Sequence, residues 1–223
     1  MKIAPSMMCA DILDLMETIA VFEKKEVEYL HIDVMDGVFV PNLQLGTEYI
    51  KALRKRTRIP LDIHLMITNP EEKLDWFDIS GGECVSVHYE STARLRLALQ
   101  SIKMKGAKPM LALNPSTSLS VVRDYLPDID AVLLMCVNPG HMGQKLLPGM
   151  LDKISSLRSY LDGSGFSHVG IEVDGNVSFE NAAKMSAAGA DIYVAGSSSV
   201  FIKGMSLENA LDKLRCCTDT GMK

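Results

Sequence analysis

The chain has 223 residues, enough for one large α/β domain or two small ones. Apolar residues make up 47% and charged residues 23%, the balance of a soluble globular protein, and the net charge of −5 argues against nucleic acid and anionic membranes as partners. The five cysteines lack C-x-x-C spacing and no apolar run reaches about 18 residues, so we expect a cytoplasmic protein with reduced thiols and no membrane segment.

Eight short apolar runs recur along the chain, and helical patterns lie between many of them. We expect the apolar runs to be strands. They cover residues 2–8, 29–35, 61–67, 84–89, 108–114, 131–138, 168–175 and 191–197. The helical patterns include residues 11–25, 70–80, 92–104, 150–161 and 178–188. Two of these begin with capping signals, Asn69 before Pro70 and Ser178 before Glu180.

Eight strand-and-helix units predict a parallel sheet closed into a single (β/α)8 TIM barrel that spans residues 1–223 as one domain. An open doubly wound sheet is the alternative. That fold would normally place a G-x-G-x-x-G turn after the first strand, where this chain has Ser6 to Cys9 without glycine.

Polar residues lie late in every predicted strand, which is where barrel enzymes carry their chemistry. They are Ser6, His31, Asp33, His64, His88, Asn114, Asn138, Asp174 and Ser197, the last with Gly196 beside it. Any one of them has a structural explanation, because a strand histidine is often a hydrogen-bonded core residue and a terminal Asp or Asn is often a cap. The same placement in strand after strand favours a shared site.

His31 and Asp33 are two residues apart, so they face the same side of their strand. With His64 and Asp174 they make a ligand set for Zn²⁺ or another first-row divalent ion, and the cation would offset the cost of burying two carboxylates. Asp62 either holds the second nitrogen of His64 or is a solvated residue at a strand start.

Two further features surround these positions. Met35, Met66 and Met135 end different strands at one level and predict an apolar floor, although methionine is also a common core filler. Glycine-containing turns follow the last three strands, at 138–144, 174–176 and 195–199, and with a short helix after the eighth strand they predict a phosphate cradle.

Six segments of the chain together resemble the ribulose-phosphate 3-epimerase family over essentially the whole length. They are "PSMMCAD" at 5–11, "LHIDVMDGVFVPNLQLG" at 30–46, "LDIHLMI" at 61–67, "VNPGHMGQKLLP" at 137–148, "IEVDGN" at 171–176 and "VAGSSSVF" at 194–201. The resemblance implies a TIM barrel of the ribulose-phosphate-binding type and a homo-oligomer, either a dimer or a hexamer.

The resemblance also implies roles for the site residues. One divalent ion per subunit, zinc first and iron, manganese or cobalt as alternatives, would be bound by His31, Asp33, His64 and Asp174. Asp33 and Asp174 would be the acid/base pair on opposite faces of a phosphorylated ketose. The remaining substrate contacts would come from Ser6, His64, His88, the three methionines, Gly140, Gly143, Gly175, Asn176, Gly196 and Ser197, with residues 140–144 as a lid.

Family members usually read "DGG" where this chain has Asp174-Gly175-Asn176, and an aliphatic residue and a serine where it has Met8-Cys9. The expected reaction is epimerisation of D-ribulose 5-phosphate to D-xylulose 5-phosphate, and these departures keep D-allulose 6-phosphate 3-epimerisation as an alternative. A sugar-phosphate lyase of the same fold and a non-enzymatic sensor are remoter alternatives. Asp36 is expected to fix a loop, and Ile32 and Val34 to pack outward.

Overall fold

The computed structural model describes residues 1–219 and contains one nine-stranded sheet. All eight predicted strands are present, and the ninth is a short strand, β3 (Leu43–Gln44), that the sequence patterns did not predict. The eight are β1 (Lys2–Pro5), β2 (Leu30–Asp36), β4 (Leu61–Met66), β5 (Cys84–His88), β6 (Lys108–Leu113), β7 (Ala131–Met135), β8 (Gly170–Asp174) and β9 (Ile192–Ala195).

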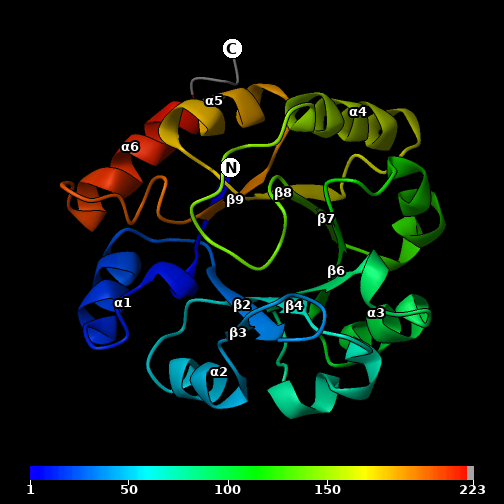
Figure 1. Cartoon of the computed structure of the whole chain (residues 1–223), viewed down its shortest axis with the longest axis horizontal. Helices are drawn as coiled ribbons and strands as arrows, with labels where there is room; N and C mark the ends of the chain where they lie inside the picture. The colour runs from blue at the N-terminus through cyan, green and yellow to red at the C-terminus, as the bar shows by residue number, and fades with distance from the viewer. Residues whose placement is uncertain (220–223) are drawn as a thin grey trace.

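The eight long strands close into a barrel. Their order is β1-β9-β8-β7-β6-β5-β4-β2, and every paired neighbour in it is parallel. β1 returns to β2 through a parallel bridge between Ser6 and His31 and through the Tyr29 N–H, which donates to the Ile3 carbonyl over 3.4 Å. Figure 1 shows the resulting ring of strands inside a ring of helices. The predicted TIM barrel is confirmed and the open sheet is wrong. β3 lies outside this ring, antiparallel to the end of β2.

Within residues 1–219, six α-helices cover the outside of the barrel (Figure 1). They are α1 (Leu15–Lys24), α2 (Thr47–Arg54), α3 (Leu95–Met104), α4 (Met150–Gly163), α5 (Phe179–Ala187) and α6 (Leu207–Asp219). After β4 and β6 the chain forms 3₁₀ segments instead. The predicted helix at 70–80 is therefore wrong: Asn69 and Asp78 are both left-handed, with φ of 46° and 49°, and the stretch between them holds only two short 3₁₀ turns.

Side chains in the preceding loops set where two helices begin. α1 and α3 start later than predicted because the Asp11 carboxylate accepts the Leu13 N–H and the Thr92 hydroxyl accepts the Arg94 N–H, which holds these residues in turns. The Ser178 cap is confirmed, since its hydroxyl accepts the Asn181 N–H at 3.1 Å. Asn69 makes no capping hydrogen bond, so that prediction is wrong.

The core has two layers because successive strand residues point to opposite faces. Ile32 and Val34 point outward into the large cluster between sheet and helices, as predicted, and Ile32 is fully buried. Full burial of such a side chain contributes about 1.5–3 kcal/mol. The inward-facing residues form a smaller cluster, including Tyr29, Met110 and Leu133, that fills the barrel below the polar residues.

No helix within residues 1–219 is both long and apolar enough to cross a bilayer. That one domain spans the whole chain stays a prediction, because its last four residues lie outside the described part.

Candidate active site

Strand register brings the predicted site residues together at the carboxyl ends of the strands. β2 and β4 pair with Asp33 beside His64 and Met35 beside Met66. Across the barrel, β7 and β8 pair with Met135 beside Asp174. Inward-facing residues at one level of a closed barrel necessarily face one another, so four strands contribute to one small space.

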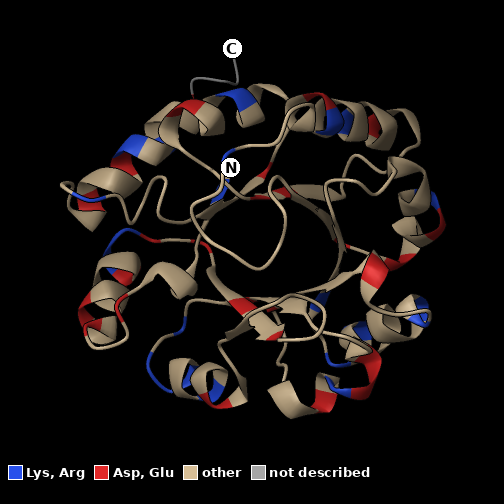
Figure 2. Ribbon diagram, viewed as in Figure 1, with Lys and Arg blue, Asp and Glu red and all other residues tan. Residues whose placement is uncertain are grey.

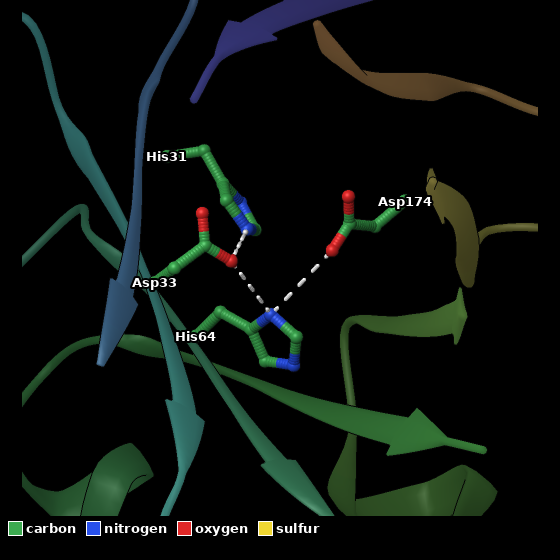
Figure 3. Close-up of side chains that lie close together, drawn as sticks. All are labelled: His31, Asp33, His64 and Asp174. Carbon is green, nitrogen blue, oxygen red and sulfur yellow. Dashed lines mark ion pairs between the residues drawn. The ribbon is translucent and has the colours of Figure 1, made fainter. Parts of the chain in front are cut away.

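His31, Asp33, His64 and Asp174 converge there, and Figure 3 shows Asp174 reaching in from the side opposite Asp33. Asp33 Oδ1 lies 3.3 Å from His31 Nε2 and 3.5 Å from His64 Nδ1. Asp174 Oδ2 lies 3.8 Å from the same His64 nitrogen. One nitrogen or oxygen from each residue falls within 4.8 Å of the others.

These four residues fit a divalent metal ion. His31 Nε2 and His64 Nδ1 are buried and make no hydrogen bond, which is costly unless something else occupies their lone pairs. Two imidazoles and two carboxylates suit zinc and its first-row neighbours. The structure therefore contains a candidate metal centre where the sequence predicted one.

The pKa values of the two carboxyl groups are shifted in opposite directions. Burial disfavours the charge of Asp33, but the charge of His31 and the two imidazoles beside the carboxylate outweigh burial and hold the pKa of Asp33 far below its ordinary value. Burial and the negative charge of Asp33 raise the pKa of Asp174 to about 7. Ser6 Oγ donates to Asp33 Oδ2 at 2.7 Å, which leaves Oδ1 facing the histidines.

Asp62 contacts a different histidine from the one predicted. Its Oδ2 lies 2.5 Å from Nδ1 of His31, its neighbour in the β2–β4 register, and it is 1% exposed, so both earlier interpretations of Asp62 are wrong. Glu172 lies beside this pair, fully buried, with Oε1 3.8 Å from His31 Nδ1. Sequence reasoning missed Glu172, although its spacing of two from Asp174 places both carboxyls on the inner face of β8.

His88 lies behind His64 and does not line the pocket described below. It is fully buried, and its Nε2 lies 2.8 Å from Nε2 of His64, with an angle of 24° between the planes of the two rings. Its Nδ1 lies 3.2 Å from Oε2 of Glu90. The structure thus does not bring His88 to the pocket wall with the other predicted substrate-binding residues.

A pocket opens above the candidate metal centre. Its floor includes Met35, Met66 and Met135, all buried. Its wall includes the predicted residues Ser6, Asp33, Gly140, Gly143, Asp174, Gly175, Asn176, Gly196 and Ser197. His31 and His64 lie below this wall, with no exposed surface. Pocket residues that were not individually predicted as substrate contacts include Met8, Cys9, Val137, Met142, Gln144, Val177, Val194 and Ser198.

The predicted lid lies over this pocket, and in Figure 1 the yellow-green loop between β7 and α4 crosses the centre of the ring. Two amides hold it: Asn42 Nδ2 donates to the Gly140 carbonyl at 3.0 Å, and Asn176 Nδ2 donates to the Gln144 carbonyl at 2.7 Å. Residues 197–201 form turns rather than the predicted short helix, so the cradle there consists of backbone turns.

Comparison with known proteins identifies the family. Residues 2–201 match the model of the Ribulose-phosphate 3 epimerase family. The chain belongs to the ribulose-phosphate 3-epimerase family. It is 42% identical over 196 residues to the ribulose-phosphate 3-epimerase of Bacillus subtilis, covering 88% of this chain and 90% of that protein. It is 43% identical over 197 residues to the chloroplastic ribulose-5-phosphate-3-epimerase of Arabidopsis thaliana, covering 87% of this chain and 70% of that protein.

Membership of this family makes the chain an isomerase, as the resemblance implied. Solved structures of more distant proteins share the fold. A 3-keto-L-gulonate-6-phosphate decarboxylase from Vibrio cholerae superposes with a TM-score of 0.72 at 12% identity, covering 100% of this chain and 99% of that one. A 3-hexulose-6-phosphate synthase from Salmonella typhimurium superposes with a TM-score of 0.68 at 15% identity, covering 99% of this chain and 100% of that one. At such low sequence identities the similarity shows a shared barrel fold only.

Proposed function

We propose that this epimerase interconverts D-ribulose 5-phosphate and D-xylulose 5-phosphate by inverting carbon 3 through a cis-enediolate. One observation carries the proposal: Asp33 and Asp174 enter one pocket from opposite sides, and only one of them has a strongly lowered pKa. Inverting a carbon beside a ketone requires a base on one face to remove its proton and an acid on the other face to return one. An ionised and a protonated carboxyl group satisfy that requirement together.

The metal ion is proposed to be bound by His31 Nε2, His64 Nδ1 and one carboxylate oxygen each from Asp33 and Asp174, with zinc as the first candidate. When bound, it supplies positive charge that stabilises the two enediolate oxygens. Ser6 holds Asp33 in orientation through its 2.7 Å hydrogen bond. The buried methionine floor would keep water away from the carbanion-like carbon.

The phosphate is proposed to bind at the opposite end of the pocket. The backbone N–H groups of Gly175, Asn176, Gly196 and Ser197 lie in turns there, and such turns bind anions. The loop at 140–144 would close over the sugar. We further propose that the enzyme is cytoplasmic, as its cysteine pattern suggested, and a homo-oligomer, as the resemblance implied.

D-Allulose 6-phosphate, one carbon longer, is the second candidate substrate. Asn176 favours it, because a side chain stands at the phosphate end of the pocket and its amide bonds to the lid carbonyl of Gln144. An added group there changes where a phosphate can rest.

The test is a side-by-side measurement of kcat/KM on both sugar phosphates with the metal-loaded enzyme. We expect the pentulose phosphate to react faster. A higher kcat/KM for the hexulose phosphate would make D-allulose 6-phosphate the assigned substrate. No turnover of either sugar phosphate would refute the proposed epimerase function. Full activity after exhaustive chelation would refute the role of the metal.

A further inference from the structure

His64 lies at one end of a buried chain of polar groups that leads away from the pocket. Its Nε2 lies 2.8 Å from Nε2 of His88, and Nδ1 of His88 lies 3.2 Å from Oε2 of Glu90. Both histidines have no exposed surface. The other oxygen of Glu90 accepts the Asn114 N–H at 2.9 Å and the Thr117 hydroxyl, so the carboxylate is held in place on its outer side.

Two ring nitrogens 2.8 Å apart share a single proton, because two N–H groups would collide and two lone pairs would repel. The chain therefore has two possible arrangements. In the first, His64 carries its proton on Nε2 and donates it to His88, and His88 carries its own proton on Nδ1 and donates it to Glu90. In the second, His88 carries its proton on Nε2 and donates it to His64, and His64 carries its own proton on Nδ1.

The carboxylate of Glu90 selects the first arrangement. The second would point the Nδ1 lone pair of His88 at an acceptor-only carboxylate oxygen 3.2 Å away, inside the protein where such repulsion is costly. The first satisfies every nitrogen of the chain except Nδ1 of His64. That nitrogen is the buried atom without a hydrogen bond that faces Asp33 and Asp174.

We infer that His88 and Glu90 are positioning residues that hold His64 in the tautomer with its proton on Nε2, so that Nδ1 presents a lone pair to the metal ion. The inference rests on the metal site of the proposed function. Metal-bound histidines commonly donate their other N–H to a carboxylate, which fixes the ring. Here His31 donates Nδ1–H directly to Asp62, whereas His64 does so through a second imidazole.

The first test measures the dissociation constant for Zn²⁺ by competition with a chromogenic chelator, using the full chain. His88→Leu removes the acceptor for the His64 proton and should weaken zinc binding roughly 10- to 100-fold, the usual range for such partners. His88→Gln can still accept that proton through its amide oxygen and should retain most of the affinity.

Glu90→Gln should also weaken zinc binding over a similar roughly 10- to 100-fold range. The amide oxygen would remain with Asn114 and Thr117, so the amide N–H would face His88 and reverse the direction of the chain. Thr117→Val is the matched control, because it loosens the outer side of Glu90 without touching either imidazole, and it should bind zinc as the wild type does. Wild-type zinc affinity in folded His88→Leu and Glu90→Gln proteins would overturn the inference.

The second test identifies the tautomers by ¹⁵N NMR of the histidine side chains, with and without zinc. We expect a proton on Nε2 of His64 and on Nδ1 of His88 in both samples. A proton on Nδ1 of His64 in the zinc-free protein would overturn the inference. This readout separates it from the proposed function: a wild-type chain that has these tautomers but neither binds zinc nor epimerises a ketose phosphate contradicts the proposed function only.

Discussion

Asp33 and Asp174 have the same side chain, and their surroundings make them chemically different. Asp33 faces two imidazoles and accepts a hydrogen bond from the Ser6 hydroxyl. The ionisation of Asp174 is instead disfavoured by burial and by the negative charge of Asp33. Environments that separate the proton affinities of two carboxyls are typical of acid/base catalysis.

Asp33→Asn and Asp174→Asn should each lower exchange of the carbon 3 proton with solvent by roughly 10²- to 10⁴-fold or more, because an amide cannot carry the proton. Deuterium incorporation from heavy water, followed by NMR of the sugar phosphate, measures this. Asp130→Asn, at the other end of the barrel, is the control. Incorporation at the wild-type rate in both variants would contradict the two-carboxyl mechanism.

Gly175 is a position where the backbone excludes a side chain. Its φ is +113°, and an added Cβ would lie 2.6 Å from Val137 Cγ2 and 2.9 Å from the Val137 backbone nitrogen. The backbone atom cannot move aside as a flexible side chain could. Glycine here lets the chain turn tightly between Asp174 and Asn176 at the end of β8.

Gly175→Ala should therefore lower the free energy of unfolding by about 2 to 4 kcal/mol, combining backbone strain with overpacking. Gly165→Ala is the matched control, because its φ is +80° and nothing lies within 4 Å of the added carbon. This variant should lower the free energy of unfolding by only about 1 to 2 kcal/mol, because alanine is less stable than glycine in the left-handed conformation. Urea unfolding compares them, and equal losses would show that the contact with Val137 is unimportant.

Among the structural elements, the loop that links β2 to β3 depends on one carboxylate. Asp36 accepts the N–H groups of Val38, Phe39 and Thr68 at 2.8 to 2.9 Å, which confirms that it fixes a loop. Partial burial disfavours its charge, but these donors outweigh burial and lower the pKa of Asp36 to about 2. The loop continues to Asn42, which bonds to the lid, so Asp36 supports the pocket indirectly.

Because this pKa is lowered, the stabilisation from ionised Asp36 is complete above about pH 4 and is lost as the pH falls through about 2. Asp36→Asn should reduce the free energy of unfolding by about 1 to 2 kcal/mol near pH 6, after allowance for partial exposure. The difference from wild type should be smaller at pH 3. Urea unfolding at both pH values tests this, and a loss that does not depend on pH would contradict the role of the charge.

Strands were predicted better than helices for a physical reason. A parallel strand buried on both faces is a short continuous apolar run, and the sequence displays it directly. Helix starts depend instead on local hydrogen bonds such as Asp11 to Leu13, and the stretch after β4 depends on two left-handed residues. Neither feature changes the apolar pattern, so the pattern could not reveal them.

At the scale of the whole molecule, Lys and Arg alternate with Asp and Glu around the outer helices (Figure 2). This mixture agrees with a modest net charge of −5 and with a small phosphorylated sugar, rather than a polyanion, as the partner. Carboxyl groups are also concentrated inside the barrel, where Asp33, Asp62, Asp174 and Glu172 lie near two histidines.

A bound cation should therefore stabilise the fold as well as the reaction. Zinc at about 100 times its dissociation constant should add about 2.7 kcal/mol to the free energy of unfolding, and chelation should remove it. Thermal melts with zinc and with chelator measure the shift. The His64→Ala variant should show little of this shift. A wild-type melting temperature that changes with neither zinc nor chelator would contradict the metal centre.

The sequence by itself determined the order of the strands and which residues face inward, because strand alternation and the apolar runs are local properties of the chain. It therefore placed His31, Asp33, His64 and Asp174 at one end of a barrel. Tertiary structure alone decided which of these groups touch. Asp62 reached His31, and His88 lay behind His64, because register between strands depends on barrel closure, which no local pattern records.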